Sequence, residues 1–245
     1  MADLNERQAK ILKTIIEEYI QTAEPVGSET LDKKYSLGIS PATIRNEMAK
    51  LTKNGFLRQP HTSAGRVPTS MGFKFYIDSL MEEKNLSVAD EVAAKEAVWD
   101  YRFEFDRLMR EVTRALAQRT KNLAVAATKE GDVYSAGVAN ILEMPEFFDI
   151  DVTRSVLELL DEARKLESFF DRAFGEDPIH VLLGDEFEQE YLKPCGLVFT
   201  HFEAGPKHSG AVGVIGPCRL NYQEIIPTVR YFGNLISEIA KNRPA

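Results

Sequence analysis

Residues 40–69, SPATIRNEMAKLTKNGFLRQPHTSAGRVPT, constrain the fold more than any other stretch of this chain. Ser40 can cap a helix, and Pro41 fits its first position, where the N–H that proline lacks is not needed. Gly55 can supply the left-handed residue that ends the helix. The segment therefore predicts a helix with a clear start and a clear stop, followed by two short extended runs.

This helix has one apolar stripe and one polar, basic side. At about 100° per residue, Ile44, Met48 and Leu51 fall on the same buried side. The opposite side carries small, polar and basic residues: Ala42, Arg45, Asn46, Ala49, Lys50 and Lys53. Such a surface suits the major groove of DNA, although an ordinary amphipathic surface helix would show the same side chains without any ligand.

The residue types on the polar side suggest how DNA would be contacted. Arg can bond a guanine edge twice, Asn can do the same with adenine, and Ala allows close approach, so Arg45 and Asn46 are candidates to read bases. Lys50 and Lys53 are candidates for phosphate contacts. The start of the helix adds further candidates to the DNA-binding set: Ser40, Ala42 and Thr43.

A hairpin is predicted directly after the helix. FLRQ and RVPT are short extended runs around HTSAG, and a turn at Gly65 would let them pair as a β-wing. The apolar residues Phe56, Leu57 and Val67 would then face inward. The wing would carry four candidates for contact with phosphates or the minor groove: His61, Thr62, Ser63 and Arg66.

The flanking segments complete a winged helix-turn-helix. Residues 4–23 have apolar side chains at helical spacing, with Asn5 and Gln8 in capping-box spacing. Ser28 can cap a short second helix, and SLGI makes the turn into the Ser40 helix. Thr69 starts a further helix with this packing face: Phe73, Tyr76, Ile77 and Leu80.

Charge divides the chain in the same way. The whole chain has a net charge of −8 and a pI near 5.2. Residues 1–80 contain 11 Lys and Arg against 9 Asp and Glu, a net charge of +2, and the remainder carries −10. Residues 40–74 hold six basic residues against Glu47 alone. A local positive surface of this kind is what counterion release from DNA requires, while the acidic part should repel nucleic acid.

The length permits two domains, and other features narrow the class of protein. No apolar run is long enough to span a membrane and the polar start lacks a signal peptide, so a cytoplasmic protein is expected. Cys195 and Cys218 lie far apart with no CxxC pairing, which argues against a disulfide framework or a zinc ribbon and indicates buried thiols.

Residues 81–119 are acidic and helical and are expected to link the two domains. Val98, Tyr101, Phe105, Leu108, Val112 and Ala115 follow a 3,4,3,4,3 spacing that is typical of a coiled-coil seam. This single helix over 88–119 would be either a dimer seam or a helix that packs on its own domain. Trp99 is expected to pack beside it.

Residues 120–245 alternate strand and helix signals. The strand-like runs are KNLAVAAT, DVYSAGVA, IHVLLG, CGLVFTHFE and SGAVGVIG, and residues 153–174 and 221–241 are expected to form long helices, the last with a kink or a delayed start at Pro227. An antiparallel sheet flanked by helices fits this order best. The fold class is therefore α+β, with predicted parts 1–80, 81–119 and 120–245.

Motifs for catalysis are missing. The glycines of SGAVGVIG do not form a phosphate fingerprint and are expected to let a strand pack against the last helix. The sequence contains no GxSxG, HExxH or Walker motif, and His201, His208 and Cys195 lack the spacing of metal ligands. We therefore predict no catalytic residue, no metal site and no cofactor.

Several segments closely resemble the HrcA family of heat-inducible transcription repressors. They are LNERQAKILKTIIEEYIQTAEPVGSETL, SPATIRNEMAKL, GFLRQPHTSAGRVPTSMGFKFYID and AVGVIGP. The resemblance implies a homodimeric repressor that binds double-stranded DNA at an inverted repeat, the CIRCE element, upstream of chaperone genes. It also implies a GAF-like second domain and a functional link to the chaperonin GroEL.

The chain departs from that family in one respect. Longer members carry an inserted dimerisation domain within the GAF-like region, whereas this chain passes from LAVAATKEGDVYSAG to NILEMPEF with no room for it. An alternative of another class is a winged-helix protein-interaction module coupled to a GAF-like small-molecule sensor. Steep weakening of binding with salt would favour DNA, because docking through an apolar face would not show it.

Overall fold

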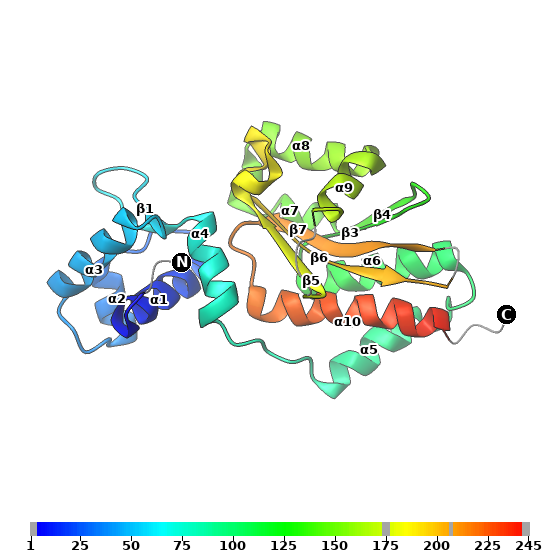
Figure 1. Cartoon of the computed structure of the whole chain (residues 1–245), viewed down its shortest axis with the longest axis horizontal. Helices are drawn as coiled ribbons and strands as arrows, with labels where there is room; N and C mark the ends of the chain where they lie inside the picture. The colour runs from blue at the N-terminus through cyan, green and yellow to red at the C-terminus, as the bar shows by residue number, and fades with distance from the viewer. Residues whose placement is uncertain (1–3, 173–176, 206–207, 242–245) are drawn as a thin grey trace. The chain divides into compact units, whose positions relative to one another are not determined.

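The computed structural model describes residues 4–172, 177–205 and 208–241 (Figure 1). Its contacts divide the chain into two compact units, Met1–Glu82 and Glu83–Ala245. No helix in the described ranges is long and apolar enough to cross a membrane. The fold is α+β, with helices and a small hairpin in the first unit and a five-stranded antiparallel sheet with flanking helices in the second.

The first unit contains helices and one hairpin. In chain order its elements are α1 (Glu6–Thr22), α2 (Ser28–Tyr35), α3 (Pro41–Lys53), β1 (Leu57–Arg58), β2 (Val67–Pro68), α4 (Ser70–Phe75) and the π-helix η1 (Tyr76–Leu80). The predicted capping box is present, because the Asn5 side chain accepts from Gln8 N and the Gln8 side chain accepts from Asn5 N. Thr69 caps α4 as predicted, and Phe73 and Tyr76 are buried.

The start of α2 differs from the prediction. Ser28 is the first residue of the helix, and the cap position belongs to Gly27, which has no side chain to offer. Because Gly27 already has the extended backbone of an N-cap residue, the helix begins at Ser28, one residue earlier than a Ser28 cap would require. The prediction that Ser28 caps this helix is therefore wrong.

The hairpin is present, but Gly65 has another role in it. β1 and β2 pair antiparallel, with Leu57 opposite Pro68. Gly65 has no left-handed backbone; instead, a Cβ on it would collide with the backbone of Val26. The glycine is needed for close approach between the wing and the chain before α2, so the predicted turn at Gly65 is wrong.

The second unit is built on one antiparallel sheet in the order β4-β3-β7-β6-β5. The strands are β3 (Leu123–Thr128), β4 (Val133–Ala136), β5 (Ile179–Leu183), β6 (Cys195–Glu203) and β7 (Ser209–Pro217). The α-helices are α5 (Val88–Trp99), α6 (Phe105–Thr120), α7 (Val138–Ile141), α8 (Ile150–Asp161), α9 (Ala163–Phe170) and α10 (Tyr222–Lys241). The 3-10 helices are η2 (Pro145–Phe148), η3 (Gly184–Phe187) and η4 (Glu190–Leu192). All five predicted strands are confirmed, although DVYSAGVA turns into α7 after Ala136.

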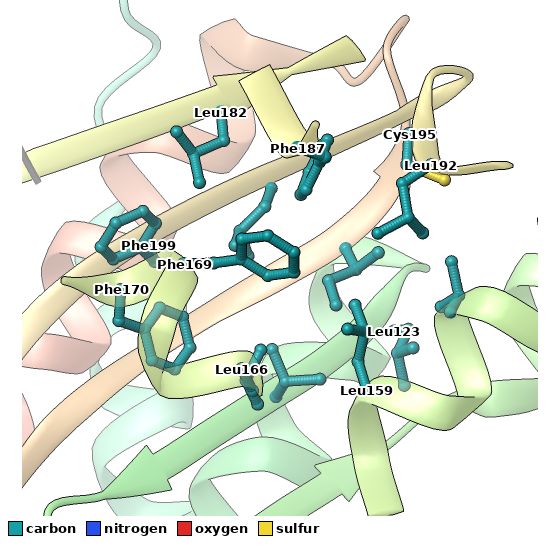
Figure 2. Close-up of a cluster of buried hydrophobic side chains, with 14 of the residues drawn as sticks. Leu123, Leu159, Leu166, Phe169, Phe170, Leu182, Phe187, Leu192, Cys195 and Phe199 are labelled. Carbon is teal, nitrogen blue, oxygen red and sulfur yellow. The ribbon is translucent and has the colours of Figure 1, made fainter. Parts of the chain in front are cut away.

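Helices cover both faces of this sheet (Figure 1). Alternate residues of β3 point to opposite faces, as a strand requires. Leu123 and Val125 join the cluster under α8 and α9 that Figure 2 shows, together with Phe169 and Phe199. The other face packs on α6 and α10, where a Cβ on Gly233 would collide with Thr200.

Two predicted long helices are each broken in two. The expected helix 88–119 is interrupted between Trp99 and Phe105, and α5 packs against α6. The expected helix 153–174 is split at Glu162, whose backbone is not helical, and its last two residues lie outside the described ranges. Helical periodicity persists across each break because both halves bury the same kind of apolar stripe against one core.

Four of the six residues of the predicted seam are interior, and the other two, Tyr101 and Ala115, are half-buried. Val98, Leu108 and Val112 are completely buried within the second unit, and Phe105 is 9% exposed. Trp99, expected to pack, is 39% exposed, with the guanidinium of Arg102 over its ring. The buried members of the set therefore belong to the core of the second unit.

The glycines of β7 allow close approach to neighbouring strands. A Cβ on Gly213 would collide with Val198 of β6, and one on Gly210 with Ala127 of β3. The expectation that this strand packs against the last helix is confirmed, since β7 contacts α10, but the glycines themselves face the neighbouring strands.

Pro227 lies inside α10 without ending it. Proline cannot donate to the carbonyl four residues earlier, which leaves the oxygen of Gln223 free within the helix. The backbone N–H of Lys84 donates to that oxygen at 2.9 Å. The chain that enters the second unit thus satisfies the carbonyl that Pro227 releases.

Both cysteines are free thiols. Cys195 is buried as predicted, and burial raises the pKa of its thiol far above the ordinary value. Cys218 is only partly buried, against the prediction, and its Sγ lies 3.0 Å from the backbone oxygen of Cys195.

Candidate nucleic-acid interface

Helix α3 presents the two sides that its sequence predicts. Ile44 and Leu51 are fully buried and Met48 nearly so. Ser40 caps the helix, since its Oγ accepts from Thr43 N at 3.2 Å. At the other end, Gly55 is left-handed, and the N–H groups of Gly55 and Phe56 return to Thr52 O and Leu51 O. These two bonds form a Schellman motif, so the predicted cap at Ser40 and the predicted helix end at Gly55 are both confirmed.

The polar side of α3 faces solvent. The exposed residues on it are Ala42, Arg45, Asn46, Ala49, Lys50 and Lys53. Over the described part of the chain, the side chains of Arg45, Asn46 and Lys53 make no hydrogen bond or ion pair. Their donors are therefore available to an external acceptor.

Lys50 is held differently from its neighbours. Its Nζ lies 2.9 Å from Glu47 Oε1, while the Gln8 side chain donates to Glu47 Oε2 at 3.0 Å. The Lys50 ammonium lowers the pKa of the buried Glu47 carboxyl, and the Gln8 hydrogen bond adds to this effect. Glu47 therefore fixes α3 to α1.

Sequence reasoning missed this role of Glu47, although a signal was present. Glu47 lies three residues after Ile44 and four before Leu51, which places it on the buried stripe. The single acid in the basic stretch is thus a structural residue.

The wing presents its tip to solvent. His61, Thr62 and Ser63 are exposed, and the Gln59 side chain donates to Thr62 O and Ala64 O at 2.9 and 3.0 Å. The His61 Nδ1 lies 3.1 Å from Ser63 Oγ. The loop that carries the predicted contacts is therefore shaped by hydrogen bonds within the wing.

Arg66 differs from the other wing candidates because it is half-buried. Its Nε donates to Thr52 Oγ1 at 3.1 Å, which ties the wing to the end of α3. Arg66 N and O also bond Val26 across a bridge. Sequence reasoning assigned Arg66 only to DNA and missed this second role.

A groove of about 440 Å³ lies between the start of α2, α3 and the wing. It brings together four of the predicted residues, Arg45, Thr62, Ser63 and Arg66. The other candidates lie outside its lining. Because residues of α3 and residues of the wing line the same groove, the two elements form one continuous surface.

The residues considered for a metal do not converge. His201 is exposed on β6, Cys195 is buried at the start of that strand, and His208 stacks on Phe105 with ring centroids 4.0 Å apart. In the ranges that the structure describes, no three His, Cys, Asp or Glu residues are arranged to hold a metal ion.

Comparison with known proteins agrees with this architecture. The family model described as "HrcA protein C terminal domain" matches residues 73–226. The heat-inducible transcription repressor HrcA of Acetivibrio thermocellus is 27% identical, with 96% of each chain covered, and that of Desulforudis audaxviator is 29% identical, with 96% of this chain and 98% of its own covered. A crystal structure of a hypothetical protein has the same fold, with a TM-score of 0.77, 20% identity, and 97% of this chain and 99% of its own covered.

The alignment is longer than this chain. The alignment to the first relative spans 336 positions, and this chain has 245 residues. At least 91 positions of that alignment therefore have no residue in this chain. Because the matched family model covers more than half of the chain, the chain belongs to the HrcA family.

Proposed function

We propose that this chain is a DNA-binding transcriptional repressor of heat-shock genes, which acts in the cytoplasm on an inverted-repeat operator of the CIRCE type upstream of chaperone genes. The observation that carries the proposal is the exposed side of α3, where Arg45, Asn46 and Lys53 have no partner among the described residues. Family membership supports the same function, because the curated relatives are named heat-inducible transcription repressors.

The proposed roles follow from chemistry and position. Arg45 and Asn46 read base edges in the major groove. Lys50 and Lys53 meet phosphates at the other end of the helix. The remaining contacts come from the start of α3 and from the wing: Ser40, Ala42, Thr43, His61, Thr62, Ser63 and Arg66.

We further propose that the protein acts as a homodimer. An inverted repeat offers two equivalent half-sites, which suit a reader with two-fold symmetry. Residues 1–80 would read the DNA, and the GAF-like residues 120–245 would support assembly and the response to the chaperonin GroEL. Because Phe105 and Leu108 are interior, the dimer interface lies outside the predicted seam.

Titration of operator and scrambled duplexes tests the proposal. Arg45→Ala and Asn46→Ala should each weaken operator binding by about 1–3 kcal/mol and leave scrambled DNA nearly unaffected. Arg107→Ala is a matched control, because Arg107 is exposed in the second unit and its ion pair is with its neighbour Glu104 on the same helix turn.

Equal losses on both duplexes would remove the base-reading role. A wild-type protein that binds neither duplex would overturn the proposed function. In that case the protein-interaction alternative would predict partner binding that salt does not weaken.

A further inference from the structure

The start of α2 has backbone donors without acceptors. Its cap residue Gly27 offers no side-chain oxygen, and the first backbone bond of the helix runs from Leu31 N to Gly27 O at 3.2 Å. In the described ranges, no acceptor meets the N–H groups of Ser28, Glu29 and Thr30. The first turn of a helix leaves such donors free and carries a partial positive charge, which together favour an anion.

The Ser28 side chain gives a second, independent indication. The residue is only 7% exposed, it lines the groove, and its hydroxyl has no hydrogen-bond partner within the described part of the chain. The Ser28 Oγ is not among the fully buried unpartnered side-chain atoms of the described residues, so this hydroxyl can reach the groove. An acceptor in the groove could therefore accept a hydrogen bond from it.

The wing holds this end of α2 in place. Val26 N and Arg66 O lie 2.9 Å apart, and Arg66 N and Val26 O lie 2.8 Å apart. This bridge fixes the chain two residues before Ser28 against the wing. The free donors of α2 are thereby kept beside the surface that α3 and the wing share.

The charges in the groove suit one phosphate. Arg45 and Arg66 line it, and Glu29 is the single carboxylate in the lining. The Glu29 side chain is exposed, in the first turn of α2. With Arg45 assigned to a base edge, an anion at the helix start would gain the Arg66 guanidinium and face one repulsive charge.

We propose that this groove binds one backbone phosphate of the operator DNA through the N–H groups that begin α2 and the Ser28 hydroxyl. The inference rests on the proposed function and adds a third element, α2, to the DNA contacts of α3 and the wing. Because Arg45 lines the same groove, a phosphate held there fixes the register in which Arg45 meets a base.

The test uses the full chain and operator duplexes in which each phosphate in turn is replaced by a neutral methylphosphonate. At one phosphate in each half-site, the replacement should weaken wild-type binding about tenfold, as expected for the loss of a hydrogen-bonded charge. The same duplex should bind Ser28→Ala as well as the unmodified duplex does, because that variant has already lost the contact. Ser79→Ala, an exposed serine on η1, is the matched control and should respond as the wild type does.

A second variant keeps the test decisive if Ser28→Ala folds poorly. Glu29→Gln alters an exposed side chain and removes the one repulsive charge, so it should bind the unmodified operator about twofold or more tightly than wild type. On the duplex with the critical methylphosphonate, that gain should vanish.

The outcomes separate this inference from the proposed function. If the wild type binds no duplex, the function fails and the inference fails with it. If the wild type binds but Ser28→Ala keeps full sensitivity to every methylphosphonate, only the phosphate site is wrong. If inorganic phosphate alone stabilises the wild type and not Ser28→Ala, while no methylphosphonate matters, the groove holds a free anion and the assignment to DNA is overturned.

Discussion

Charged side chains on the second unit and on the exposed side of α3 are used differently. Several basic side chains of the second unit are bound to acidic ones of the same unit, as in Arg219 with Glu146, Arg230 with Glu83 and Arg119 with Asp90. On the polar side of α3, by contrast, Arg45 and Lys53 have no partner in the described residues. Charges of the first kind hold a fold together, while those of the second kind are available to a ligand. A count of net charge would not separate them.

The largest expected effect comes from placing a charge in the second unit's core. Leu108 is fully buried on α6, so Leu108→Glu should destabilise that unit by about 4 kcal/mol or more. Trp99 is the chain's single tryptophan and lies in this unit, so urea unfolding followed by its fluorescence reports the change.

This variant also tests the interface. If Leu108→Glu were fully stable but monomeric in sedimentation, the residue would be a dimer contact and its interior position would be wrong. Hydrogen exchange of residues 6–53 should stay unchanged, because the first unit has its own core.

Breaking a paired charge should have the next largest effect. Arg219 Nε lies 2.6 Å from Glu146 Oε1, and the two side chains are only 15% and 17% exposed. Arg219→Ala leaves a largely buried carboxylate unpaired and should cost about 3 kcal/mol of unfolding free energy.

Arg107→Ala serves as the control for that measurement. Its pair with Glu104 is exposed, so the loss should stay below about 1 kcal/mol. Equal losses of unfolding free energy in the two variants would show that the buried and the exposed ion pair contribute equally to stability.

One ion pair in the first unit is also internal, and acid should reveal it. Lys34 Nζ and Tyr35 Oη lie 2.6 Å from the oxygens of Glu18, whose side chain is 4% exposed. The Lys34 hydrogen bond, followed by that from Tyr35, lowers the pKa of Glu18 below its ordinary value of 4.5. A carboxyl with a lowered folded pKa stabilises above 4.5, and this stabilisation is lost as the pH falls through the folded pKa.

Glu18→Gln should therefore cost about 2 kcal/mol at neutral pH and flatten the acid unfolding of the first unit. Hydrogen exchange of residues 6–35 at a series of pH values measures this. Part of the acid dependence should remain, because Glu47 also has a lowered pKa. Glu24→Gln, on an exposed residue after α1, should behave as wild type; an equal change there would point to net charge instead of the Glu18 cluster.

Local sequence signals predicted local structure well. The Asn5 capping box, the Ser40 cap and the Gly55 ending each depend on residues within a few positions of one another, and each is confirmed. The strands of the sheet were recognised because apolar and small residues cluster in short runs between turn formers.

The errors arose where distant residues decide the outcome. A glycine is needed at position 65 because the Val26 backbone lies against it. The carbonyl that Pro227 frees accepts from Lys84 N, which is far away in sequence. Periodicity could not show the break between Trp99 and Phe105, because both helices bury their apolar stripes in one core. Among the candidate site residues, the exposed side of α3 could be predicted from periodicity. The contacts of Lys50 with Glu47 and of Arg66 with Thr52 could not, because they depend on how the folded side chains meet.

The smallest effect should distinguish the two lysines at the end of α3. Lys53 has no partner in the described ranges, whereas Lys50 is held 2.9 Å from Glu47. If each meets a phosphate, Lys53→Ala should reduce the slope of log affinity against log salt by about 0.9, on operator and scrambled DNA alike. Lys50→Ala should reduce it by less, because Glu47 already neutralises part of that charge and fewer counterions leave the DNA. Binding titrations at several salt concentrations measure both slopes. Equal reductions would mean that DNA pulls Lys50 away from Glu47, and internal pairing would then not decide which charges of the first unit reach the ligand.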